Sequence, residues 1–232
     1  MPVSTFPTTR RSVVLALRSD DAEERSRAFD TLVAIYWKPL YKCARVAWSR
    51  SREDCEDLTQ SFFATALEKD ALASYDAAKA SFRTFLRLLF ERHVLNQVKA
   101  AQRIKRGGGA TQLAFDEAEG EMQSEAGASL SPEEYFQREW VRSVFALAVQ
   151  RVREQVPERL FALFEAYDLS DDRTVSYRAL AARFGVPETT VTNQLASVRR
   201  QFRRIVLDTL REATASEEEF RAEARALLGV DA

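Results

Sequence analysis

The chain has 232 residues, 46% of them hydrophobic and 30% charged, a globular composition that excludes a largely disordered protein. Its length is enough for one domain or two small ones. Two cysteines, Cys43 and Cys55, are too few for a disulfide framework, and a single histidine gives no cluster typical of a zinc site. No apolar run approaches the ~18 residues of a membrane span. The N-terminal patch VVLAL is too short for a secretory signal, so we expect a cytoplasmic protein.

Charge is distributed unevenly along the chain. Residues 79–106 carry eight Lys or Arg and one acid, a net charge of +7, and residues 173–211 carry eight Arg and two acids, a net charge of +6. Residues 110–140 carry eight acids and one Arg, a net charge of −7, and residues 212–232 carry six acids and two Arg, a net charge of −4. The total of −1 argues against a nucleic-acid-binding protein, but it conceals two basic blocks that favour one.

Helical period dominates the sequence. Only seven glycines and six prolines interrupt the chain, so we expect an all-α protein. The glycine-rich, acidic composition of 107–132 predicts a flexible acidic linker between two helical domains. The other predicted parts are an N-terminal extension at 1–25, helical domains at 26–106 and 133–211, and an acidic C-terminal extension at 212–232.

The first domain is predicted to contain three main helices. Apolar residues at helical spacing begin at Phe29, and Pro39 is expected to kink or restart that helix. Ser51 is placed to cap the next helix, whose first turns are acidic. The third helix is predicted from about Phe82 to Arg106.

The polar side of this third helix forms the first basic surface. Five of its residues recur at helical spacing and share one face: Arg92, Asn96, Lys99, Arg103 and Arg106. Lys105 lies beside this stripe, and Arg83 and Arg87 extend it upstream. The pattern is typical of a surface that follows phosphates, and Asn96 can also bind a base edge. The alternative is a solvated helix face, but such faces usually mix charges and only Glu91 does so here.

The second basic block predicts a helix-turn-helix. An apolar helix with Ser176 as its cap ends at Gly185, and Pro187 suits the start of the next helix. The outward side of that next helix carries short polar side chains: Thr189, Thr190, Thr192, Asn193, Gln194 and Ser197. Four arginines follow: Arg199, Arg200, Arg203 and Arg204. This order suits a recognition helix that contacts bases with its first part and phosphates with its second. A plain helical hairpin is the alternative.

Two DNA-contacting domains joined by an acidic linker resemble bacterial RNA polymerase sigma factors of the extracytoplasmic-function type. The resemblance covers residues 26–106 (region 2) and 133–211 (region 4). Its most specific motif is EDCEDLTQSFFATALEK at residues 53–69, which is similar to the acidic helix that docks on the β′ clamp helices of core polymerase. The residues that carry this implied contact are Glu56, Asp57, Leu58, Gln60 and Phe63.

The resemblance also assigns promoter contacts. The segment from Ser81 to Arg106 is similar to the helix that contacts the minus-ten element, and residues 73–80 match a loop that captures a flipped base. The implied loop contacts are Ser74, Tyr75, Asp76 and Lys79. The helix-turn-helix corresponds to region 4, which binds the minus-thirty-five element beside the β flap. Arg92, Asn96, Thr192 and Ser197 depart from the usual family residues, which bears on the promoter sequence that is recognised.

The sequence therefore predicts a sigma factor that directs core RNA polymerase to promoter DNA and helps to open it. An anti-sigma factor or kinase is compatible with this role as a regulator, but no residue identifies one. The alternative is a stand-alone helix-turn-helix repressor or activator, which would not need the motif from Asp57 to Phe63. An enzyme is not expected, because no catalytic triad, phosphate loop, metal-ligand cluster or cofactor motif is found.

Overall fold

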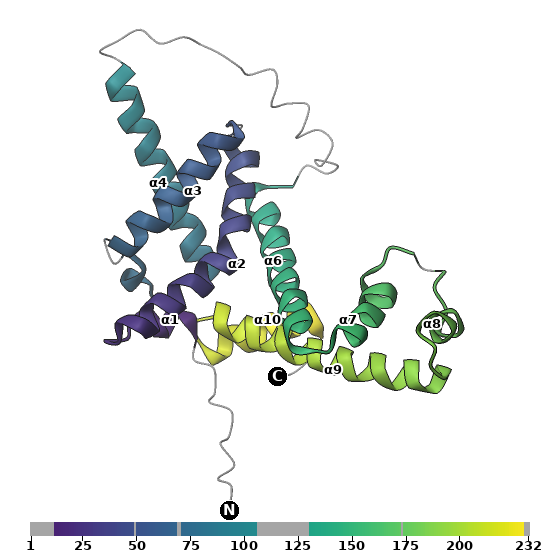
Figure 1. Cartoon of the computed structure of the whole chain (residues 1–232). Coiled ribbons are helices and arrows are strands. Elements are labelled where there is room, and N and C mark those ends of the chain that lie inside the picture. The colour runs from purple at the N-terminus through teal and green to yellow at the C-terminus, as the bar shows by residue number, and fades with distance from the viewer. Residues whose placement is uncertain (1–11, 49, 69–70, 106–129, 173, 230–232) are drawn as a thin grey trace, which may run out of the picture. The chain divides into compact units, whose positions relative to one another are not determined.

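The computed structural model describes most of the chain, with residues 101–105 described by their backbone alone. The described residues are 12–48, 50–68, 71–105, 130–172 and 174–229. All regular elements in these residues are helical, which confirms the predicted all-α class (Figure 1). The chain divides into two compact units, one made of Met1–Ser143 with Arg211–Ala232 and the other of Val144–Leu210.

The two units differ in their bounds from the predicted domains. The first unit takes in residues 133–143 and the C-terminal segment, which composition assigns to the second domain and to a separate extension. Large apolar side chains explain the difference: Trp140 and Phe220 are each 1% exposed. The guanidinium of Arg83 lies 5.0 Å from the centre of the Trp140 ring, and that of Arg211 lies 4.0 Å from the Phe220 ring. Of the predicted linker, only residues 130–132 are described.

The first unit is built around three long helices. Its elements are α1 (Val13–Ala16), α2 (Ala22–Trp48), α3 (Arg52–Glu68), the 3-10 helix η1 (Ala71–Ser74), α4 (Phe82–Lys105), the start of α6 (Pro132–Gln155) and α10 (Glu217–Leu228). Helix α2 continues through Pro39, so the expected restart is not observed. Ser51 caps α3 as predicted, because its hydroxyl accepts a hydrogen bond of 3.1 Å from the backbone N–H of Asp54.

Aromatic side chains hold α2, α3 and α4 together. Phe62 of α3 meets the Phe90 ring of α4 edge to face, with ring centroids 5.2 Å apart. Phe63 stacks on Trp37 of α2, with centroids 6.0 Å apart. Tyr36 of α2 meets the first residue of α4, Phe82, in a T-shaped contact of 5.9 Å. These contacts fix the axis of α4, whose outer face carries the first predicted basic surface.

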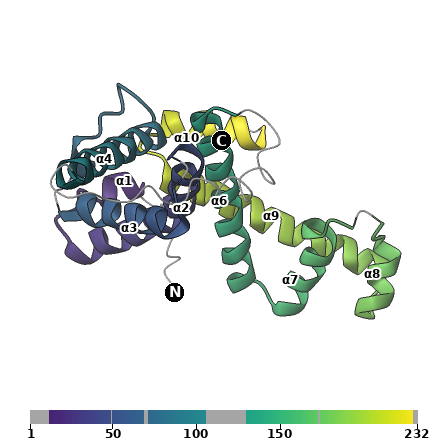
Figure 2. The same ribbon diagram turned by 90° about the horizontal axis from the view of Figure 1, so that it is seen from above.

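The second unit contains the rest of α6 and four further helical elements. They are α7 (Glu158–Phe164), the π-helix η2 (Glu165–Leu169), α8 (Tyr177–Phe184) and most of α9 (Glu188–Ala213). Figure 2 shows α7 beside α9 and α8 next to the start of α9. Val191, Leu195, Val198 and Ile205 form a buried stripe on α9 at helical spacing, and Phe202 in the same stripe is half-buried.

The turn between α8 and α9 also forms as predicted. Ser176 caps α8, with its hydroxyl accepting a bond of 3.1 Å from the N–H of Ala179. Gly185 ends the helix in the left-handed conformation at φ 63°, and the N–H of Val186 donates back to the Ala181 carbonyl over 3.1 Å. Pro187 immediately precedes α9, so only three residues connect the two helices.

Candidate functional site

The acidic motif of α3 is divided between surface and core. Asp57 and Gln60 are exposed, as a contact surface requires. Leu58 and Phe63 are instead 8% and 4% exposed, so they contribute little to that surface. Helical period explains this correction, because both belong to the stripe that packs against α2 and α4. Glu56 is half-buried and accepts a bond of 2.8 Å from the Arg52 guanidinium.

A shallow hollow of about 350 Å3 lies beside the exposed acids. Asp54, Asp57, Leu58 and Ser61 of α3 line it together with Arg50, which precedes α3, and Gln97 of α4. The hollow therefore joins the acidic face of α3 to the polar side of α4. Gln97 is a contributor that the motif alone does not reveal, since it lies far away in the sequence.

The middle of α4 carries the free part of the basic surface. Arg92, Asn96 and Lys99 are all exposed, as their spacing predicts. Within the described residues, neither Arg92 nor Lys99 forms an ion pair with a carboxylate. Arg103 and Lys105 lie in the last turns of α4, whereas Arg106 is outside the described residues. Cations that lack acidic partners keep their charge available for an external anion.

A small pocket of about 170 Å3 lies against this free surface. Arg92 and Asn96 line one part of it, and Phe62, Ala71 and Leu89 supply apolar walls. His93 also lines the pocket, and one of its ring nitrogens lies 3.0 Å from the Ser61 hydroxyl. The sequence prediction missed Phe62, Leu89 and His93 as lining residues. Helical spacing could have found the last two, because Leu89 and His93 each lie three residues before Arg92 and Asn96, respectively.

The arginines near the N-terminal end of α4 form ion pairs with carboxylates of the same unit. The Arg83 guanidinium pairs with the buried Glu223 carboxylate of α10. Arg87 pairs with Glu91 and lies 3.7 Å from a carboxylate oxygen of Glu133. Because both cations are neutralised within the unit, the predicted role of Arg83 and Arg87 as free phosphate contacts is not supported.

The loop before α4 differs from the expected base-binding surface. Tyr75 is 8% exposed, its hydroxyl donates to the Ala80 carbonyl over 3.0 Å, and burial raises its pKa to about 12. It therefore packs as a core residue and cannot stack on an external base. Ser74, Asp76 and Lys79 are exposed. Asp76 accepts from the N–H of Ala78 and pairs with Lys79 over 3.1 Å; these contacts lower the pKa of Asp76.

The C-terminal helix α10 packs against α4 rather than standing apart as an extension. Glu219 accepts a 2.9 Å hydrogen bond from the N–H of Phe82, so it satisfies a free donor at the start of α4. The same carboxylate accepts from the N–H of Ala215 over 2.9 Å, while burial raises its pKa. The Tyr36 hydroxyl donates to the Ala213 carbonyl over 3.1 Å.

The recognition surface of α9 is largely available. The exposed predicted contacts are Thr189, Thr192, Asn193, Ser197, Arg200, Arg203 and Arg204, whereas Thr190 and Gln194 are half-buried. The Thr192 hydroxyl donates to the Glu188 carbonyl over 3.1 Å, and its remaining lone pairs can still accept. This arrangement presents short polar groups first and cations later, as the sequence predicts.

Arg199 is the exception on α9. Its Nε and Nη2 atoms donate to Asp168 of η2 over 3.0 and 2.8 Å, and its Nη1 donates to the Tyr177 hydroxyl over 3.2 Å. Its guanidinium also lies 5.3 Å from the centre of the Tyr167 ring. Arg199 thus connects α9 to η2 and α8, and it is not the free phosphate contact that was predicted.

No protein-family model matches the chain, and none of the curated proteins matches it. Among the described residues, the helices that are long enough to cross a bilayer are not apolar enough to do so.

Proposed function

We propose that the protein is a sigma factor, which binds core RNA polymerase, directs it to promoters and helps to open the DNA. One observation carries the proposal: the first unit has an acid-amide surface on α3 beside a cationic surface on α4 whose Arg92 and Lys99 form no ion pair within the described residues. Asp57 and Gln60 are exposed on the first, and Arg92 and Lys99 on the second. Two adjacent surfaces of opposite charge suit a protein that bridges a basic polypeptide and DNA.

In this proposal α4 contacts the minus-ten region. Arg92 and Lys99 bind phosphates, while the 170 Å3 pocket between Phe62 and Leu89 accepts an unstacked base. Extruding a base costs a few kcal/mol of stacking, which apolar walls and an amide donor offset. Asn96, at the edge of the pocket, is the residue placed to recognise the base.

The second unit supplies the other promoter contact. Asn193 and Ser197 of α9 bind base edges in the major groove, and Arg200 and Arg204 bind the DNA backbone. In the proposed complex, promoter specificity is shared between α9 and α4.

The alternative function is a stand-alone helix-turn-helix regulator, a repressor or activator. The favourable observation is the turn at Gly185, since a complete helix-turn-helix forms within the second unit. Such a regulator would bind a palindrome as a dimer. It would not require Asp57 and Gln60 to be exposed.

In vitro transcription with bacterial core polymerase separates the two functions. We expect the chain to activate transcription from the DNA upstream of its own gene only when core enzyme is present. Asp57→Ala with Gln60→Ala should lower core binding at least tenfold in a pull-down titration, as expected when two polar interactions are removed. Asp30→Ala, which removes an exposed carboxylate on α2, is the matched control and should bind normally. Tight specific binding by the free protein as a dimer, with no effect of core enzyme, would instead establish the regulator.

A further inference from the structure

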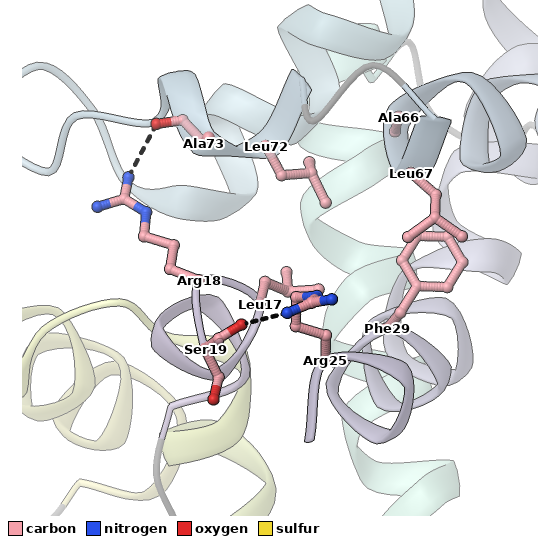
Figure 3. Close-up of a pocket in the computed structure, with 9 residues that line it drawn as sticks. All are labelled: Leu17, Arg18, Ser19, Arg25, Phe29, Ala66, Leu67, Leu72 and Ala73. Atoms are coloured by element: carbon pink, nitrogen blue, oxygen red, sulfur yellow. Dashed lines mark hydrogen bonds between the residues drawn. The ribbon is translucent and has the colours of Figure 1, made fainter. Parts of the chain in front are cut away.

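A larger pocket than the two described above also opens in the first unit, and the proposed function assigns it no role. It has a volume of about 520 Å3 and lies where the α1–α2 connection, α2, the end of α3 and η1 meet (Figure 3). Small-molecule sites typically occupy roughly 300–1,000 Å3. Among the residues that the structure describes, it shares only Ala66 with the pocket beside Arg92, so the two are treated as separate features.

Most of the pocket wall is apolar. Figure 3 shows Phe29 of α2 close to Leu67 of α3, while Leu72 of η1 points into the same space. Leu17 supplies a further apolar wall from the α1–α2 connection. Leu67 is 57% exposed, among the highest values for a large apolar side chain in the described residues. An apolar ligand body that covered these side chains would remove this surface from water.

Two guanidinium groups complete the lining. Arg18 donates from Nη2 to the carbonyls of Ala73 and Tyr75 over 3.1 and 2.9 Å, and Arg25 donates from Nη1 to the Ser19 carbonyl over 2.7 Å. These partners are neutral, and neither arginine pairs with a carboxylate in the described part of the chain. A guanidinium has five N–H donors, so both groups retain donors for an anion.

We propose that this pocket binds a small organic anion with a carboxylate or phosphate group on an aromatic or branched apolar body. Leu67, Phe29 and Leu72 take the body, while Arg25 and Arg18 bind the anionic group. Guanidinium groups bind carboxylates and phosphates through charge-assisted hydrogen bonds, which are stronger than neutral ones. The proposal does not depend on the proposed function.

The composition of the pocket wall favours this ligand class over inorganic phosphate, a neutral apolar molecule and a DNA strand. Inorganic phosphate would leave the surface of Phe29 and Leu67 uncovered, and a neutral apolar molecule would leave both guanidiniums without an anionic partner. A DNA strand is a poor fit, because a surface that follows a backbone presents successive cations rather than an apolar cup. The favoured ligand therefore combines both chemical features in one small molecule.

Binding would act on the segment after η1. Arg18 already holds the carbonyls of Ala73 and Tyr75, and Leu72 belongs to the pocket wall. An anion on Arg18 would fix its side chain and, through these bonds, the backbone from Ala73 to Tyr75. Ligand binding would therefore restrict the conformation of the loop that precedes α4.

Fluorescence titration of the full chain with anilinonaphthalene sulfonate, an aromatic anion, tests the site. We expect saturable binding of one molecule per chain. Arg25→Gln and Leu67→Ser should each raise its Kd about tenfold, because the first removes a charge-assisted bond and the second removes apolar surface. The matched controls are Arg27→Gln on the same helix and Leu15→Ser, whose leucine is 55% exposed but does not line the pocket. Both controls should bind like the natural sequence.

Displacement of the dye tests the ligand class. Phenyl phosphate should displace it at lower concentration than either inorganic phosphate or benzyl alcohol, since only phenyl phosphate combines both features. Equal dye binding by Leu67→Ser and Leu15→Ser, with circular dichroism showing both variants folded, would overturn the site. Equal displacement by benzyl alcohol and phenyl phosphate would overturn the anionic class.

Discussion

Arg199 and Arg200 are neighbours in sequence with different surroundings. Arg199 is held by Asp168 and Tyr177, whereas Arg200 is exposed on α9. Both belong to the same basic cluster in the sequence, and only the fold separates a cation with structural partners from one that is exposed. Neighbouring substitutions are therefore expected to have different consequences.

Arg199→Gln should lower the free energy of unfolding of the second unit by about 1–2 kcal/mol, because charged hydrogen bonds are removed at a partly exposed position. Arg200→Gln should change it by less than about 0.5 kcal/mol. Urea unfolding followed by circular dichroism gives both values. In the proposed polymerase–promoter complex, Arg200→Gln should instead reduce the slope of log K against log salt by roughly 0.9. If Arg200→Gln lost stability and Arg199→Gln did not, the assignment of Arg199 as the structural cation would be wrong.

Glu219 gives a pH dependence of known sign. Burial raises the pKa of its carboxyl, so the folded chain holds this proton to a higher pH than the unfolded chain does. The stabilising contribution is complete below the unfolded pKa of about 4.3 and is lost as pH rises through the folded value. Glu219→Gln stays neutral and can still accept a hydrogen bond from the N–H of Phe82. The variant should therefore gain stability relative to the natural chain as pH rises above about 4, measured by urea unfolding from acid to neutral pH. An identical pH profile for both proteins would show that the carboxyl is not perturbed.

At the scale of elements, α10 belongs to the interior of the first unit. Phe220→Ala should cost about 3–5 kcal/mol of stability, because it leaves a cavity where a buried ring stood. The three tryptophans of the chain, Trp37, Trp48 and Trp140, all lie in this unit, so their fluorescence reports its unfolding specifically. Arg221→Ala, at an exposed position of the same helix, should leave the fluorescence midpoint nearly unchanged. A normal midpoint for Phe220→Ala would mean that α10 does not support the unit.

Local sequence signals predicted the helices and their caps, whereas tertiary contacts determine which charged side chains are paired and which are exposed. The caps at Ser51 and Ser176 and the left-handed Gly185 depend on residues a few positions away, and the structure has each of them. Arg83 meets a carboxylate 140 residues away, and Arg199 meets one 31 residues away. Helical period identifies such residues as polar, but it contains no information about a partner on another helix. The same limit hid the pockets, whose walls come from separate helices.

For the whole molecule, the net charge of −1 hides a local cationic surface. In the proposed polymerase–promoter complex, replacing both Arg92 and Lys99 by Gln should reduce the salt slope of DNA binding by roughly 1.8, or about 0.9 for each phosphate that is no longer neutralised. Lys38→Gln, at an exposed position of α2, serves as the control and should leave the slope unchanged. Filter binding from low to moderate salt measures these slopes. An unchanged slope in the double variant would remove α4 from the DNA interface.

The discontinuous first unit imposes an order on synthesis. Residues 12–143 emerge from the ribosome before the whole second unit, yet Phe82 and Arg83 find their carboxylate partners only in α10. The separations are 137 and 140 residues, so at about 5–20 residues per second the start of α4 must wait on the order of ten seconds before Glu219 and Glu223 arrive. Closure between such distant segments is also slow, because loop entropy must be given up before the segments meet. During this interval the nascent helices expose the apolar surface that Phe220 covers in the folded unit. A chaperone or protease therefore has its best access to the chain at this stage of translation.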